Sequence, residues 1–271
     1  MRGLAFSLML AVTCWGVPVW ADARLTVLLD RLRLDEVTQL YRDEGIAYAS
    51  TLNDDMLDGQ GGGFWETQVS RIYDPQVMGE HIRAGFEETM SDAELAAALL
   101  FYDSALGDRL VSLENAARTA MMDEDVEEAA LAAYKALRAK DDPSLEALDA
   151  LVADADLVDR NVAAAMSSNL SFYQGLSEGK YLSLSADAIL NEIWSQEETL
   201  RRETEDWLYS YFVLAYQSLP PEDLQLYVRF SQTEAGRSMT RALFAGHDRM
   251  YRAISYALGR AVALSAAGST L

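Results

Sequence analysis

Two histidines, each three residues from a methionine, are the first residues in this sequence that could do chemistry. Met78 precedes His81 by three positions, and Met250 follows His247 by three. Residues three apart share one face of a helix, and a thioether beside an imidazole suits Cu(I). Because the chain has ten methionines, such pairs also arise by chance, and polar helix positions are the simpler interpretation. We expect no cofactor and assign no metal ligand, with copper left open at both pairs.

Hydrolysis is the second chemistry that the residue types allow. The sequence has no HExxH zinc motif and no serine in a GxSxG context. Two carboxylates suffice for glycoside hydrolysis, but 43 acidic residues offer too many pairs to choose one. We therefore assign no catalytic residue, and a carboxylate-dependent hydrolase of envelope glycans stays the alternative to a non-catalytic protein.

Two further segments resemble ligand loops but lack the residues that such loops need. The glycine-rich run Gly59–Gly63 is followed by no Lys-Ser or Lys-Thr pair, so we expect a flexible turn rather than a phosphate loop. The acidic run Asp123–Glu128 has neither the spacing nor the glycine of an EF-hand. We expect it to be a solvated helix face.

The N-terminus has the pattern of a secretory signal peptide. Arg2 precedes a nine-residue apolar run, Leu4–Val12, which is too short to cross a bilayer. Small residues then indicate cleavage after Ala21, with Ala23 as the second choice. The sole cysteine, Cys14, leaves lipidation open. We predict that residues 1–21 are removed and that the protein is periplasmic or secreted, without a transmembrane segment in the mature chain.

Composition favours an all-α fold and argues against anionic partners. Half of the residues are apolar, only five are proline, and alanine and leucine are abundant. The formal net charge is −21, and phosphate binding requires clustered lysine and arginine, which the sequence lacks. We therefore expect no nucleic-acid partner, and a protein or apolar ligand of the cell envelope instead.

A short pattern occurs twice in the sequence, and each residue of the second copy stands 129 positions after its counterpart in the first. The matched positions are Trp65 with Trp194, Leu95 with Leu224, Phe101 with Phe230, Ser104 with Thr233, and Gly107 with Gly236. These are packing or capping types, and within the repeated motif the only acids that correspond are Glu94 and Asp223. Periods this long suggest duplicated units rather than a short-repeat solenoid.

Each copy is predicted to form a helix, a tight break and a second helix. Ser91 and Glu94 have the spacing of a capping box, so a helix should begin at Asp92. Ser104 and Thr233 suit the N-caps of the following helices. We expect Gly107 and Gly236 to admit a neighbouring helix closely, and Phe101 and Phe230 to pack in the core.

The first copy resembles a known family. Glu94-Leu95, Phe101-Tyr102, Ser104 and Gly107 are similar to the core motif of bacterial domain-of-unknown-function family 2059. The family commonly has a proline after the Ser or Thr, where this chain has Ala105 and Glu234. The resemblance implies a helical fold and an exported protein, and it implies no catalytic residue.

The rest of the chain completes the predicted architecture of two tandem helical units. Helices are expected over Ala23–Leu34 and from a cap at Asp35, then over Phe64–Tyr73, and over Gln76–Thr89 after the cap and first-turn proline of Asp74-Pro75. Further helices are expected over Leu106–Ala139 with a break at Met122-Asp123, Leu145–Val152 capped by Ser144, Asp156–Leu176, Ala186–Leu219 in one or two pieces, and His247–Leu264. Gly175 and Gly179 should bracket a loop. The stripe Trp207, Tyr211 and Leu214 should lie in the core.

These helices group into a first unit over residues 22–140, a linker over 141–144, a second unit over 145–265 and a flexible tail over 266–271. A groove between two such units is the usual place for a ligand or a partner helix. The sequence therefore predicts a non-catalytic binding or interaction module.

Overall fold

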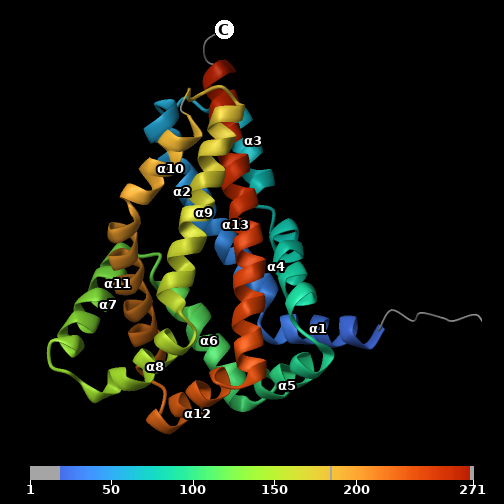
Figure 1. Cartoon of the computed structure of the whole chain (residues 1–271), viewed down its shortest axis with the longest axis vertical. Helices are drawn as coiled ribbons and strands as arrows, with labels where there is room; N and C mark the ends of the chain where they lie inside the picture. The colour runs from blue at the N-terminus through green and yellow to red at the C-terminus, as the bar shows by residue number, and fades with distance from the viewer. Residues whose placement is uncertain (1–18, 184, 269–271) are drawn as a thin grey trace, which may run out of the picture.

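The computed structural model describes residues 19–183 and 185–268, and these are helical throughout, without a β-strand (Figure 1). The all-α prediction is confirmed. The helices are α1 (Val19–Arg31), α2 (Leu34–Leu57), α3 (Gly62–Ile72), α4 (Pro75–Thr89), α5 (Asp92–Tyr102), α6 (Ala105–Ala120), α7 (Glu124–Arg138), α8 (Glu146–Asp154), α9 (Leu157–Glu178), α10 (Ala186–Ser195), α11 (Glu197–Tyr216), α12 (Pro221–Ser231) and α13 (Glu234–Gly268), with a 3-10 turn at Pro143–Leu145.

Several helices begin where the sequence placed a cap. The Asp74 carboxylate accepts hydrogen bonds from the first free backbone N–H groups of α4, which has Pro75 at its start. Ser91 and Glu94 form the expected capping box at α5, and Asp123 caps α7 after the predicted break. These are contacts within four residues, so local sequence is enough to predict them.

Two predicted caps are wrong. Asp35 lies in the first turn of α2, and the residue before that helix is Arg33, in the left-handed region with φ 52°. Between the two predicted units, Asp142 rather than Ser144 is the N-cap, and the element that it caps is the 3-10 turn Pro143–Leu145. The Asp142 carboxylate accepts a hydrogen bond from the backbone N–H of Ser144. In both cases the observed cap lies two residues before the one that the side-chain pattern indicated.

The last helix is much longer than predicted. Instead of beginning at His247, α13 runs for 35 residues from Glu234 to Gly268, along most of the height of the molecule beside α9 and α4 (Figure 1). The described part of the predicted tail, residues 266–268, belongs to this helix. Ser265, directly before it, is buried. Packing along its length supports the helix through positions that the sequence pattern left ambiguous.

Glycines allow the two neighbours of α13 to approach closely. A Cβ on Gly85 of α4 would lie 2.3 Å from the backbone N of Gly246, and one on Gly175 of α9 would lie 2.2 Å from the carbonyl oxygen of Tyr256. The expected loop therefore does not begin at Gly175, which is inside α9, but at Gly179. The two crossings hold α13 in the middle of the bundle.

Two hydrophobic cores lie side by side, and each draws on both halves of the chain. The larger core joins α1 to α5 with α9 and α13, and the smaller joins α6, α7 and α8 with α11 and α12. The two predicted units therefore share both cores across residues 141–144. Among the described helices, none is both long and apolar enough to span a bilayer. Cys14 and residues 1–18 of the predicted signal peptide lie outside the described residues.

Candidate functional site

The two copies of the repeated pattern have the same local structure. The helices α5 and α12 have equal lengths, and α6 and α13 follow after the same break. The hydroxyl of Ser104 accepts from the N–H of Gly107 at 3.1 Å and donates to the carbonyl of Phe101 at 2.6 Å. Thr233 repeats both contacts, with Gly236 at 3.1 Å and Phe230 at 2.7 Å.

The two repeated glycines each admit a neighbouring helix closely, as expected. A Cβ on Gly107 would lie 2.4 Å from the carbonyl oxygen of Phe101, and one on Gly236 would lie 2.1 Å from that of Phe230. The close neighbour is in each case the C-terminal end of the preceding helix, α5 or α12. A glycine is needed here because the tight break folds the chain back on itself.

The two phenylalanines of the pattern lie where the two copies meet. The rings of Phe101 and Phe230 stack face to face, and Tyr102 contacts Phe230 edge to face. Both phenylalanines are only partly buried, whereas Leu95 and Leu224 are buried in the larger and the smaller core respectively. The repeated motif therefore joins the two halves at the base of the molecule.

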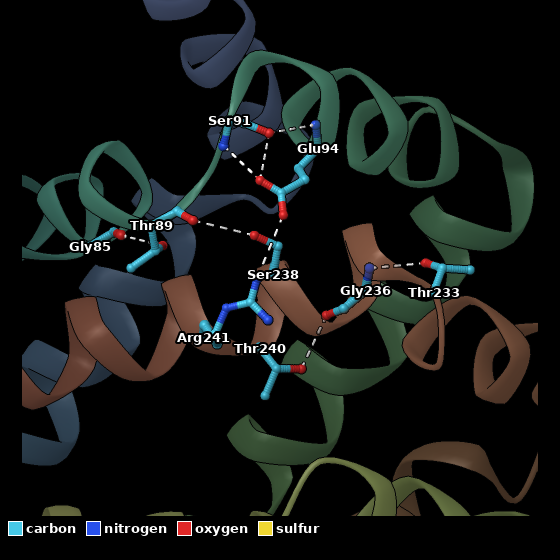
Figure 2. Close-up of polar contacts among 9 residues, drawn as sticks. All are labelled: Gly85, Thr89, Ser91, Glu94, Thr233, Gly236, Ser238, Thr240 and Arg241. Carbon is cyan, nitrogen blue, oxygen red and sulfur yellow. Dashed lines mark hydrogen bonds and ion pairs between the residues drawn. The ribbon is translucent and has the colours of Figure 1, made fainter.

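Glu94 links the first copy to α13 in addition to capping α5. One carboxylate oxygen accepts from the Ser91 N–H at 2.7 Å and hydroxyl at 2.6 Å, and the other lies 3.5 Å from the guanidinium of Arg241 (Figure 2). Beside it, Ser238 donates to the carbonyl of Thr89 at 3.4 Å. Hydrogen bonds from Ser91 lower the pKa of Glu94. These contacts give Glu94 a structural role.

The matched tryptophans occupy different environments. Trp65 of α3 is 4% exposed in the larger core, whereas Trp194 of α10 is 61% exposed. The reason is that α3 packs against α13 while α10 packs mainly against α9 and α11. The shared position of the two residues therefore does not mark a shared site.

In the second of the two histidine–methionine pairs, contacts within the protein engage the histidine. Met78 and Met250 are buried in the larger core, and both nitrogens of His247 have partners. Its Nδ1–H donates to the Leu243 carbonyl at 2.7 Å, so its Nε2 accepts from the Tyr41 hydroxyl at 2.9 Å. Burial lowers the pKa of His247 to about 4. Within the described residues, no group of three or more histidine, cysteine or acidic side chains could hold a metal ion.

An ion pair lies beside that histidine, where α2 and α6 meet α11. Arg118 donates two hydrogen bonds to Glu44, at 2.9 and 2.8 Å. Its guanidinium also lies 4.6 Å from the ring centroid of Tyr41 and 5.8 Å from that of Trp207. Bidentate geometry and aromatic neighbours are typical of a fixed arginine, so this pair positions α6 against α2 and α11.

One carboxyl group has the raised pKa expected of an acid catalyst, but its surroundings are structural. Burial raises the pKa of Glu114 to about 7, and hydrogen bonds from Tyr216 and Tyr227 partly oppose the rise. The Tyr216 hydroxyl donates to Glu114 at 2.6 Å, and Tyr211 donates to its backbone carbonyl at 3.2 Å. The tyrosines occupy the positions that a substrate would need.

A groove between α7, α9 and α11 is a candidate binding site because it brings Trp207, Leu131 and Leu208 together. Its volume is about 560 Å³, within the range of ligand sites. We call it the Trp207 groove; its lining is Glu127, Leu131, Asn161, Ala165, Glu203, Thr204, Asp206, Trp207, Leu208 and Ser210. Because α7 precedes residues 141–144 and the other two helices follow them, the groove lies between the two predicted units.

Trp207 also borders a second cavity, on the side of α2 and α6. This cavity has a volume of about 280 Å³ and is lined by Glu44, Arg118, Met121, Met122 and Trp207. Trp207 is partly exposed and stacks on Tyr211, with centroids 5.2 Å apart. The predicted core stripe therefore contains a groove residue. Its helical spacing could not reveal this, because the same spacing describes a buried stripe.

The lining of the groove around Trp207 combines apolar side chains with carboxylates. The groove has apolar side chains from three helices and carboxylates from two, whereas Glu114 and His247 line neither this groove nor the adjoining cavity. The two groups with the most informative pKa shifts are thus engaged with tyrosine hydroxyls. A ligand in the groove would contact a tryptophan face, leucines and carboxylates.

Comparison with known proteins finds a match for one region of the chain. No curated protein and no solved structure matches it. Residues 76–134, which extend from α4 into α7 and include the first copy of the motif, match the model of a family described as an uncharacterized protein conserved in bacteria. This match confirms the resemblance of the region carrying Glu94, Phe101 and Gly107 to the bacterial family DUF2059.

Proposed function

We propose that the protein is a non-catalytic binding module of the bacterial cell envelope and that its ligand binds in the Trp207 groove. The observation that carries the proposal is the groove itself, which lies between the two halves and has Trp207, Leu131 and Leu208 in its lining. Concave, mainly apolar sites of this size at the junction of two units are typical of ligand binding. The signal-peptide pattern at residues 1–21 supports an envelope location.

The alternative function, a glycan hydrolase, has less support. Such an enzyme needs one protonated and one ionised carboxyl group on opposite sides of the bond that is cleaved. Glu114 has a raised pKa, but Tyr216 is bound to its carboxylate and it does not line the groove. The carboxylates that do line the groove, Glu127, Glu203 and Asp206, are better explained as charged edges around an apolar floor.

We further propose that the two halves arose by duplication. The helix order supports this, because α1, α2, α3, α4 and α5 correspond to α8, α9, α10, α11 and α12, and α6 with α7 corresponds to α13. The main packing partners correspond as well: α1 packs on α5 as α8 packs on α12, and α2 on α4 as α9 on α11. The groove would then be a feature of the paired halves that neither half has alone.

Binding of a neutral apolar dye, Nile red, tests the proposed function. We expect saturable fluorescence enhancement that is lost in Trp207→Ala and kept in Trp194→Ala, because Trp194 lies on α10 outside the groove. Trp207→Phe, which keeps an aromatic ring, should retain most of the binding and shows whether the fold is intact. Equal binding by both alanine variants would contradict the assignment of the groove. Turnover of glycan, peptide or ester substrates that disappears in Glu203→Gln would favour the hydrolase instead.

A further inference from the structure

The edges of the Trp207 groove carry negative charge that the protein itself does not neutralise. Asp206 pairs with Lys135 at 3.1 Å. Glu127 of α7 and Glu203 of α11 are both exposed, and within the described part of the chain neither has an ion-pair partner. Glu127 lies on α7 and Glu203 on α11, the helix that packs against both α7 and α9, so the two unpaired carboxylates border the groove from different elements.

The exposed surface of the rest of the groove is mainly apolar, with Asn161, Thr204 and Ser210 as its neutral polar residues. Leu208 is 6% exposed, and Leu131, Ala165 and Trp207 are partly exposed, so each of these three still offers surface to a ligand. An apolar anchor would bury this surface at about 25 cal/mol per Å². An anionic ligand would meet repulsion at the edges, whereas a cationic one would gain Coulomb energy there.

We infer that the Trp207 groove, once the proposed binding function is granted, takes a cationic amphipathic peptide segment. Such a segment presents one large apolar side chain to Trp207 and Leu131, with lysine or arginine on each side of it toward Glu127 and Glu203. Helices that dock in a groove use this arrangement of apolar anchors and flanking charges. The formal charge of −21 adds long-range attraction for a basic partner and repels anionic lipids.

A pair of synthetic peptides tests the inference on the full chain. One has leucine and lysine at amphipathic helical spacing, and the other has glutamate in place of each lysine. We expect the lysine peptide to bind in calorimetric titration and the glutamate peptide to show no binding. Binding should weaken as salt rises, because exposed charge pairs are screened. Equal binding of the two peptides would overturn the inference.

Neutralising the edges of the groove provides the matched control. Glu127→Gln with Glu203→Gln should weaken the lysine peptide about tenfold, since two exposed ion pairs are lost. Asp54→Asn with Asp55→Asn removes the same charge from an exposed part of α2 and should change the affinity less than twofold. If the two double variants bind alike, only the overall charge matters and the inference is wrong.

The Nile red titration separates failure of this inference from failure of the proposed function. If the dye binds in a Trp207-dependent way and the lysine peptide does not bind, the groove is a binding site for a different ligand and only the cationic partner is refuted. If neither the dye nor the peptide binds, both proposals fail. If the peptide binds but Trp207→Ala leaves its affinity unchanged, the peptide uses another surface and the inference fails.

Discussion

The phenyl rings of Phe101 and Phe230 lie face to face, with centroids 3.9 Å apart and planes inclined by 3°. The two residues are far apart in the sequence but hold matching positions in α5 and α12. Phe101 packs against both hydrophobic cores, so the stack is the point where the repeated motifs join the halves of the molecule. Its neighbours Tyr102 and Tyr227 extend the aromatic cluster.

This stack predicts energetic coupling between the two motifs. Because both rings are only partly buried, Phe101→Ala and Phe230→Ala should each reduce the free energy of unfolding by roughly 2–4 kcal/mol, at or below the lower part of the range for buried phenylalanine. The double variant should fall short of additivity by about 0.5–1.5 kcal/mol, the value of an aromatic pair. Urea denaturation of the four proteins measures the cycle, and strict additivity would show that the rings do not stabilise one another.

The repeated glycines should be intolerant of even a methyl group. Gly107→Ala and Gly236→Ala place a Cβ within 2.4 Å and 2.1 Å of a backbone carbonyl oxygen, so each should cost roughly 1–3 kcal/mol of stability. Gly63→Ala in α3 is the control, because a Cβ there meets no atom within 4 Å and alanine favours a helix. Thermal melts should thus move down for the first two and stay or rise for the third. An unchanged melt for Gly107→Ala would mean that the break can relax.

Two buried groups should give opposite pH dependences of stability. The folded-state pKa of Glu114 is raised by burial to about 7, so the folded protein holds more protons than the unfolded chain from about pH 4.5 to 7. Its contribution is therefore largest at low pH and is lost as the pH rises through 7. The folded-state pKa of His247 is lowered by burial to about 4, so its contribution is present above about pH 6.5 and is lost as the pH falls toward 4.

Single variants should separate these two effects. Glu114→Gln keeps an acceptor for the Tyr216 hydroxyl but no longer titrates, so this variant lacks the stability that Glu114 adds as the pH falls. Only the destabilising effect of His247 remains, and the variant should therefore lose stability more steeply than the wild type as the pH falls below 6.5. His247→Gln should instead gain stability relative to pH 8 as the pH falls from 7 to about 4.5, by roughly 2–3 kcal/mol. Urea midpoints between pH 4.5 and 8 measure both. Parallel curves for Glu114→Gln and the wild type would contradict the raised pKa.

Export predicts a defined mature N-terminus. The apolar run Leu4–Val12 and the small residue Ala21 indicate cleavage that leaves Asp22 first, or Arg24 if cleavage follows Ala23. Intact-mass analysis of the protein from the periplasmic fraction of its bacterial host should show one of these two starts. Retention of Met1 would refute both the signal peptide and the envelope location.

The sequence by itself determined the all-α class, many helix boundaries and the family motif. The capping box of Ser91 and Glu94 and the caps at Asp74 and Ser104 are hydrogen bonds between residues two or three apart. Their geometry is set by the local backbone, so residue types and spacing were sufficient. The equal structure of the two breaks follows for the same reason.

Only the tertiary structure decided which helix faces pack against one another. The hydrogen bond between Tyr41 and His247 joins residues 206 positions apart, and nothing local indicates it. Trp65 and Trp194 share a sequence position but differ in burial, because the element that covers a helix is chosen by the packing of the whole bundle. Helical periodicity shows that Trp207 belongs to an apolar stripe, but only the placement of α7 and α9 around it leaves a groove there.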